Sequence, residues 1–327
     1  KTIGLPITNP SKQIIEGNQL AAMTTHELSG RISDVVLFCR VTPMDKLKIV
    51  TALQAVGGIV AMTGDGVNDA AAIKKADIGI VVADASDVAK EIADVVLVDS
   101  NIRTIAAAVE EGRGIFENIR KVVLYLVSDS FVEILVIVVS ILLGLPLPLT
   151  ALQILWINLV ADGLPSLALI ADPLRTGLMR MRPRAKGTPI IDQPMRVIIG
   201  LISISAVLFV IGGFYWALVR SGGNLAYAQT LVFTMVAVDS LIYVFSARRM
   251  HARLTLGSIV RNRWLVGAIA VGFILQLFAV YHEWGNDAFG TTAIGSIEWL
   301  VIIGASLSML GMIEITKIRV IREIREK

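Results

Sequence analysis

The sequence predicts two parts of different fold class, an α/β domain over residues 1–120 and an all-α membrane domain over residues 121–327. In the first part, short β-branched runs alternate with helix-forming segments, which is typical of a parallel sheet covered by helices on both faces. In the second part, apolar runs reach about 20 residues, the length that crosses a bilayer. The mean hydropathy of +0.72 is too high for an ordinary soluble protein.

Composition narrows the classes of function. The net charge is only +3, so the sequence does not indicate a nucleic-acid partner. The single Cys39 excludes a disulfide framework within the chain, and it forms no zinc-type cluster with the widely separated His26, His251 and His282. The sequence starts with neither an initiator Met nor an apolar leader, so we expect it to be the interior of a longer protein.

The first part contains four predicted strands, at 34–40, 59–62, 78–82 and 94–98, and helices between and after them at 42–56, 70–76, 86–93 and 101–121. Thr42 is the expected N-cap of its helix, with Pro43 at the first helical position. Gly57 and Gly58 end that helix before the next strand.

The most informative stretch of this part runs from Ile59 to Ile73 and contains Gly64-Asp65-Gly66-Val67-Asn68-Asp69. It reads as a buried strand, a tight turn with two carboxylates, and a helix. Ligands of open α/β sheets bind at the carboxyl ends of strands. The two glycines are expected to permit backbone angles closed to other residues and a close approach to an anion. Two carboxylates near a phosphate indicate Mg²⁺, although a simple turn and helix cap is the alternative.

Lys46 begins a helix one βα unit before this turn, and its side chain could reach a phosphate at the same sheet edge. The alternative is a solvated surface lysine.

The second part contains six predicted membrane spans. They cover residues 122–143, 149–170, 195–219, 226–245, 264–281 and 297–316.

Basic residues gather between spans two and three, between spans four and five, and after span six. They are Arg175, Arg180, Arg182, Arg184 and Lys186; Arg248, Arg249, Arg253, Arg261 and Arg263; and Lys317, Arg319, Arg322, Arg325 and Lys327. The alternate loops carry few cations. The positive-inside rule therefore places the α/β domain, the basic loops and the C-terminus in the cytoplasm. The alternative, a large soluble helical protein, does not explain this periodic asymmetry of charge.

Polar residues inside the spans mark an expected path for an ion, because a charged group at mid-membrane is costly and usually faces a bundle interior. Glu133 lies in the first span, and Asn158 and Asp162 share one helix face in the second. Gly163 and Pro165 predict an interrupted helix that frees carbonyls beside Asp162. Carboxylates, an amide and carbonyls are the ligands of a hard cation. Asp239, in the fourth span, is a further candidate, whereas we expect Asp129 either to make an interhelical hydrogen bond or to lie near the interface.

Two motifs carry a resemblance to a known family. Thr63-Gly64-Asp65-Gly66-Val67-Asn68-Asp69, with Lys74-Lys75-Ala76-Asp77-Ile78-Gly79-Ile80, resembles the hinge motif of P-type cation-transporting ATPases. Leu155-Trp156-Ile157-Asn158-Leu159-Val160-Ala161-Asp162-Gly163-Leu164-Pro165 is similar to the ion-binding helix of the calcium-pump branch. The resemblance covers nearly the whole chain. It implies the rear half of a haloacid-dehalogenase-like, Rossmann-like phosphorylation domain, followed by a six-helix transmembrane bundle.

The resemblance also implies roles for individual residues. Asp65 matches the Mg²⁺-binding Asp, with Asn68 and Asp69 as supporting residues, and Lys46 matches the lysine that contacts the phosphoryl group. The neighbouring Thr63, Gly64 and Gly66 are expected to line the same phosphate site. Positions that coordinate transported Ca²⁺ are matched by Glu133, Asn158 and Asp162, and an acidic position of that branch is matched by Asp239.

Two departures from the calcium-pump pattern leave the ion open. Ser130 stands where the family has a ligand Asn, and Ala161 stands where it has a ligand Thr. The site nearest Glu133 is therefore weakened, which makes one ion per cycle, or transport of Na⁺, K⁺, Mn²⁺ or H⁺, an alternative to the Ca²⁺ pattern.

The family's phosphorylation motif, Asp-Lys-Thr-Gly, does not occur in these residues, and the nucleotide-binding domain that would hold the substrate ATP is also absent. We therefore expect the C-terminal part of a multi-pass pump of the cell membrane, inactive alone and completed by the N-terminal part of the same protein. The alternatives are a naturally truncated membrane protein that regulates or assembles with a pump, and a membrane-tethered phosphatase. The phosphatase would need a nucleophilic Asp-x-Asp upstream, and residues 1–40 contain none in a strand context.

Overall fold

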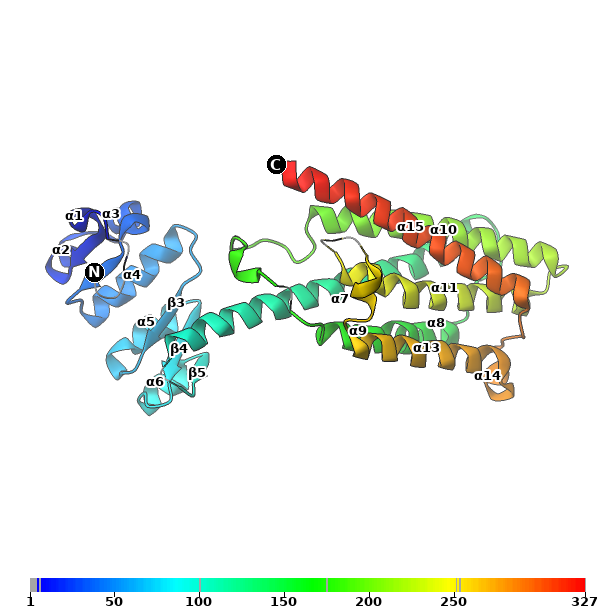
Figure 1. Cartoon of the computed structure of the whole chain (residues 1–327), viewed down its shortest axis with the longest axis horizontal. Coiled ribbons are helices and arrows are strands. Elements are labelled where there is room, and N and C mark those ends of the chain that lie inside the picture. The colour runs from blue at the N-terminus through cyan, green and yellow to red at the C-terminus, as the bar shows by residue number, and fades with distance from the viewer. Residues whose placement is uncertain are drawn as a thin grey trace. The chain divides into compact units, whose positions relative to one another are not determined.

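A computed structural model describes residues 5, 7–99, 101–174, 176–250, 252 and 254–326. The chain divides into two compact units (Figure 1). The first contains residues 1–111 and 179–188, and the second contains residues 112–178 and 189–327. The structure is mostly helical, with two small parallel sheets, both in the first unit.

The first unit begins with α1 (Pro10–Gln13), β1 (Ile14–Glu16), α2 (Gly17–Ala22), α3 (Thr25–Arg31), a 3-10 turn (Ile32–Asp34) and β2 (Leu37–Cys39). Next come α4 (Pro43–Ala55), β3 (Ala61–Gly64), a 3-10 turn (Val67–Asp69), α5 (Ala70–Lys75), β4 (Ile78–Val82), α6 (Asp87–Ile92) and β5 (Val95–Leu97).

Helix α4 begins as its local sequence predicts. The Thr42 hydroxyl accepts a hydrogen bond from the Asp45 amide, the Asp45 carboxylate accepts one from the Thr42 amide, and Pro43 occupies the first turn. This reciprocal capping box satisfies amides that have no partner within the helix. Gly57 follows the helix with φ +83°, a left-handed conformation that glycine adopts without strain.

The strands form two sheets instead of the single sheet that the alternation of elements predicts. β2 pairs with β1, a strand absent from the prediction, whereas β3, β4 and β5 form a separate three-stranded parallel sheet. β3 also lies two residues further along the chain than predicted and ends at Gly64. The predicted turn with two carboxylates, residues 65–69 (the Asp turn), therefore begins directly after the last residue of its strand.

The second unit begins within α7 (Ile102–Leu142), a continuous helix of 41 residues. The predicted helix at 101–121 and the predicted span from 122 are both helical and form one continuous helix. No proline interrupts residues 102–142, so backbone hydrogen bonding continues through Lys121 and Val122 although polarity changes there.

The other elements of the second unit are helical. They are α8 (Ala151–Trp156), a π-helical segment (Ile157–Asp162), α9 (Gly163–Ile170), α10 (Gln193–Arg220), α11 (Leu225–Arg248), α12 (Leu256–Ile259), α13 (Arg263–Tyr281), α14 (Glu283–Phe289) and α15 (Ser296–Glu326). A 3-10 turn at Leu178–Arg180 lies at the boundary with the first unit.

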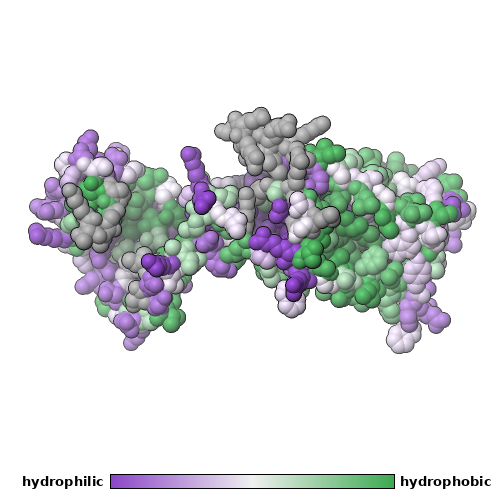
Figure 2. All heavy atoms as spheres, viewed as in Figure 1, coloured by the Kyte–Doolittle hydropathy of each residue, from purple (hydrophilic) through white to green (hydrophobic). Residues whose placement is uncertain are grey.

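The described residues contain six helical segments long and apolar enough to cross a membrane, as predicted. They are Arg103–Leu142, Ala151–Ile170, Gln193–Arg220, Leu225–Arg248, Arg263–Tyr281 and Ser296–Lys317. Hydrophobic side chains cover much of the exposed face of these helices in Figure 2. Helix α11 has the largest buried share and packs against α10, α13, α15 and the π-helical segment, so it is the central helix of the bundle.

The second span is interrupted, but by a π-helical segment and not by an unwound loop. Pro165 has no amide hydrogen, so the carbonyl of Ala161, four residues earlier, lacks its usual α-helical donor. The hydroxyl of Tyr125 on α7 donates to that carbonyl over 2.9 Å. The prediction of a freed carbonyl beside Asp162 is therefore correct in kind, but a tyrosine already occupies it.

Several basic positions of the sequence analysis cannot be located. Arg175, His251 and Arg253 lie outside the described residues, and so do the side chains after Lys317.

Candidate functional site

The first candidate site is the Asp turn of the first unit. Asp65 follows the end of β3 directly, and its backbone carbonyl accepts a hydrogen bond from the amide of Ser86 over 3.1 Å. Its carboxylate is exposed, as are the neighbouring Thr63 and Asn68. The turn then enters α5 through Asp69, which is only 7% exposed. One carboxylate of the turn is therefore exposed at the strand end, and the other is buried.

Lys46 reaches this turn from the first turn of α4. Its ammonium lies 2.5 Å from Asp69 Oδ1, and the Lys46 side chain remains one-third exposed. The structure thus brings Lys46 and Asp69 together, although β2, the strand before α4, and β3 belong to different sheets and share no sheet edge. Because Asp69 is paired with Lys46, Asp65 is the carboxylate of the turn that is available to a metal.

The two glycines of the turn have different roles, and the expected backbone freedom is not one of them. Neither Gly64 nor Gly66 has a positive φ. A Cβ atom on Gly64 would lie 2.5 Å from Asp69 Oδ2 and 2.7 Å from Asp69 Cβ, whereas a Cβ on Gly66 would meet nothing closer than the Asn68 amide at 3.9 Å. Gly64 is therefore required for the close approach of Asp69, and Gly66 is not required sterically.

Asp77 fixes the far end of α5 against the strand. Its carboxylate accepts hydrogen bonds from the Val60 amide over 3.0 Å, the Gln54 side chain over 3.1 Å and Lys186 over 2.8 Å. The bond from Lys186, followed by those from Val60 and Gln54, holds the pKa of Asp77 well below its usual range. These three hydrogen bonds stabilise the ionised form of Asp77. Asp77 has a structural contact here and lies outside the Asp turn.

The second candidate site lies inside the helical unit. Asn158 Nδ2 donates to both carboxylate oxygens of Glu133, over 3.0 Å each, and also to the carbonyl of Ile154 over 2.9 Å. Glu133 is 7% exposed. The contact joins α7 to the π-helical segment, so the structure brings together two of the predicted ion ligands from different spans.

Asp162 pairs instead with Asp129. The hydroxyl of Ser240 on α11 lies 2.5 Å from Asp162 Oδ1 and 2.8 Å from Asp129 Oδ2. Both carboxylates are buried, at 2% and 6% exposure. A hydroxyl has one hydrogen to donate, so these two carboxylates share one donor. Among the described residues, neither forms an ion pair with a Lys or Arg.

The sequence analysis missed two members of this group, Tyr125 and Ser240, and did not expect Asp129 to lie beside Asp162. Asp129 does make the interhelical hydrogen bond expected of it, but with the serine that also binds Asp162. Tyr125, four residues before Asp129, lies 2.7 Å from Ser240 Oγ. The spacing of Tyr125, Asp129 and Glu133, four residues apart each time, puts them on one helix face and could have indicated the group. Nothing in the sequence singles out Ser240.

Two further positions make no hydrogen bond with the predicted ion ligands among the described residues. Asp239 precedes Ser240 on α11, but no hydrogen bond or ion pair joins it to Glu133, Asn158 or Asp162 within the described part of the chain. Ser130, at the position where the family has a ligand Asn, is exposed. No three His, Cys, Asp or Glu side chains gather as a metal-binding cluster in the residues described, so a cation in the bundle would also need amide, hydroxyl or carbonyl oxygens.

Known proteins resemble the chain along most of its length. Residues 146–319 match the family described as cation transporting ATPase, C-terminus. The chain is 42% identical over 304 residues to a calcium-transporting ATPase of Bacillus subtilis, covering 90% of this chain and 33% of that protein. It is 33% identical over 316 residues to the human calcium-transporting ATPase type 2C member 1, covering 96% of this chain and 34% of the relative. A protein of Synechocystis named cation-transporting ATPase pma1 is 35% identical over 308 residues, covering 92% of this chain and 34% of that protein. The chain spans about a third of the length of the curated relatives it matches.

Proposed function

This chain belongs to the cation-transporting ATPase family, and we propose on that premise that it forms the C-terminal part of an ATP-driven pump that transports Ca²⁺. Two sets of contacts between membrane-capable helices carry the proposal. Asn158 donates to Glu133, and Asp129 and Asp162 share the hydroxyl of Ser240. Ca²⁺ is the ion named for the relatives of Bacillus subtilis and human. The pump would cycle through an aspartyl-phosphate whose Asp lies in the remaining two-thirds of such a protein.

We assign residues 1–120 to the rear half of a haloacid-dehalogenase-like phosphorylation domain and residues 121–327 to the transmembrane domain. Support for the first assignment comes from the exposed Asp65 at the end of a parallel strand, beside a lysine-paired Asp69. In this assignment Asp65 holds Mg²⁺, with Asn68, Asp69, Thr63, Gly64 and Gly66 shaping the turn around it. Lys46 is placed to contact the phosphoryl group. Bound Mg²⁺ would neutralise charge on that group during transfer.

In the transmembrane domain, we propose Glu133, Asn158 and Asp162 as ligands of the transported cation, with Asp239 as a more distant acidic group. The carboxylates of Asp162 and Asp129 share one hydroxyl donor, so a cation between the helices would compensate charge that the described residues leave uncompensated. Asn158 now directs its nitrogen at Glu133, and it would have to present its oxygen to a cation.

The described basic residues between spans support a cytoplasmic location for the first unit, the basic loops and the C-terminus. We propose a multi-pass protein of the cell membrane with this orientation.

The test is ATP hydrolysis by the full-length protein, purified and reconstituted, over a panel of Ca²⁺, Mn²⁺, Na⁺, K⁺ and H⁺. Ca²⁺ should stimulate the wild type, and Asp162→Asn should abolish the stimulation because the substitution removes a buried negative charge. Asp287→Asn is the matched control, since Asp287 is exposed on α14 outside the spans. Stimulation by another ion of the panel would overturn Ca²⁺ as the substrate, and unchanged stimulation in Asp162→Asn would overturn the site.

A further inference from the structure

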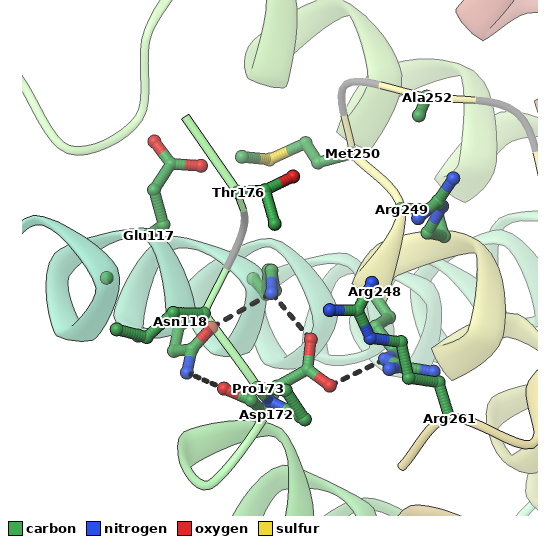
Figure 3. A pocket seen from close by; sticks show the side chains of 13 residues that line it. Glu117, Asn118, Asp172, Pro173, Thr176, Arg248, Arg249, Met250, Ala252 and Arg261 are labelled. Atoms are coloured by element: carbon green, nitrogen blue, oxygen red, sulfur yellow. Dashed lines mark hydrogen bonds and ion pairs between the residues drawn. The ribbon is translucent and has the colours of Figure 1, made fainter. Parts of the chain in front are cut away.

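A polar cavity of about 230 Å³ lies at the end of the helical unit where α9 and α11 end and α13 begins (Figure 3). Its charged lining residues come from α7, from the segment after α9, from the end of α11 and the residue that follows it, and from the segment before α13. They are Glu117, Lys121, Asp172, Arg248, Arg249 and Arg261. The cavity shares no residue with the Asp turn or with the group around Asp162.

The floor of the cavity is a fixed ionic network centred on Asp172, which is 6% exposed. Asp172 Oδ2 accepts from Lys121 over 2.7 Å, and Oδ1 accepts from Arg248 over 2.7 Å and from Asn262 over 3.1 Å. Asn118 donates to the Asp172 carbonyl over 2.8 Å. The donors come from separate elements, so Lys121 and Arg248 are held in place before any ligand arrives. Figure 3 shows Asn118 and Arg248 beside Asp172.

The cavity carries a surplus of positive charge. Four of its lining residues are cations and two are carboxylates, and Asp172 already accepts bonds from two of the cations. Arg261 is exposed at the lining, so a ligand can reach it from solvent. The cavity has room for a group several times larger than one water molecule, which occupies about 30 Å³ in the liquid. An anion of the size of a phosphate group therefore complements the site in both charge and volume.

The position of the cavity and its apolar walls indicate which kind of molecule carries that anionic group. Pro173, Leu174 and Met250 give the cavity an apolar side. It opens among the ends of membrane-capable helices, where bilayer headgroups lie. Basic pockets between such helices recognise anionic headgroups. We propose that this cavity binds the phosphate-bearing headgroup of an anionic phospholipid. The proposal does not depend on which ion the protein transports, or on whether it transports one.

The test measures lipid retention by the full-length protein, delipidated in detergent and then given dioleoylphosphatidylglycerol, with bound lipid counted by native mass spectrometry. Wild type should retain one such lipid in preference to phosphatidylcholine. The double variant Arg249→Gln/Arg261→Gln should bind it more weakly, by about fivefold for each cation removed. Arg263→Gln is the matched control, because Arg263 is exposed at the start of α13 and does not line the cavity. Arg261→Lys keeps the charge and should retain the lipid.

Thermal melting of each variant confirms that it is folded before lipids are counted. Equal retention in the wild type and the double variant would overturn the proposal. A loss of equal size in Arg263→Gln would also overturn it, because the attraction would then be a general effect of surface charge. A parallel measurement with radiolabelled inorganic phosphate and no lipid separates the two sources of phosphate. If the double variant loses bound phosphate while phosphatidylglycerol retention is unchanged, a lipid is not the occupant.

Discussion

Asn158 Nδ2 faces the carboxylate of Glu133 and donates to both of its oxygens, over 3.0 Å each. The contact holds two predicted ion ligands together across two helices, and the amide nitrogen, which cannot bind a cation, points at the carboxylate. Cation binding at this place therefore requires the amide to turn and present its oxygen.

The Asn158→Ala variant should weaken cation binding by about tenfold to a hundredfold, because it removes both a proposed oxygen ligand and the group that positions Glu133. The measurement is the cation concentration that half-maximally stimulates ATP hydrolysis by the full-length protein. Ser130→Ala is the control, since Ser130 is exposed and no side-chain hydrogen bond of it is found in the described structure. A shift of similar size in Ser130→Ala would show that Ser130 is a ligand after all.

The Ser240→Ala variant should destabilise the cation-free protein by about 1–3 kcal/mol, because two buried carboxylates lose the donor that they share. Thermal unfolding in detergent measures the change. Added Ca²⁺ should reduce the difference from wild type, since a bound cation replaces the lost donor. Ser308→Ala serves for comparison, because the Ser308 hydroxyl is exposed and bonds only the Gly304 carbonyl of its own helix. Identical melting of wild type and Ser240→Ala would contradict the shared-donor arrangement.

Two alanine substitutions in the Asp turn should have unequal effects. Gly64→Ala puts a methyl group 2.5 Å from Asp69 Oδ2, so Asp69, which pairs with Lys46, must shift. If Asp69 has the proposed role, ATP hydrolysis by the full-length protein falls about a hundredfold, because a displacement of about 1 Å at a reaction site costs about that much. Gly66→Ala meets nothing nearer than 3.9 Å and should keep most of the activity. Equal losses in the two variants would mean that backbone freedom, and not the approach of Asp69, is what the turn requires.

The stability of the first unit should depend on Asp77 at acidic pH. The pKa of Asp77 is lowered in the folded state, chiefly by the hydrogen bond from Lys186. A carboxylate with a lowered pKa contributes stability above its unfolded pKa, and that contribution is lost as the pH falls through the folded pKa. Wild type should therefore lose stability progressively below about pH 4.

Urea unfolding at a series of pH values measures this loss. In Asp77→Asn, the part of the loss of stability at acidic pH that is due to Asp77 should disappear. In Asp84→Asn, which changes an exposed carboxylate, that loss should remain. An unchanged acid dependence in Asp77→Asn would remove Asp77 as its source.

The sequence by itself determined the features that depend on neighbours along the chain. Thr42 and Pro43 predict the start of α4 because capping uses groups three residues apart. Six spans follow from the lengths of apolar runs, and the Asp turn follows from its strand and glycines. The predicted strand at 59–62 lies two residues before β3, because the apolar run that predicts it begins in the loop ahead of β3.

Only the tertiary structure decided which of these features meet. Whether β2 joins the sheet of the Asp turn depends on β1, which lies in a stretch without a clear strand pattern. The pairing of Asp129 with Asp162 depends on the rotation of α7 and on Ser240, a residue about 110 positions away on α11. Helical periodicity fixes which residues share a face but not which face another helix covers, because packing among several helices sets that choice.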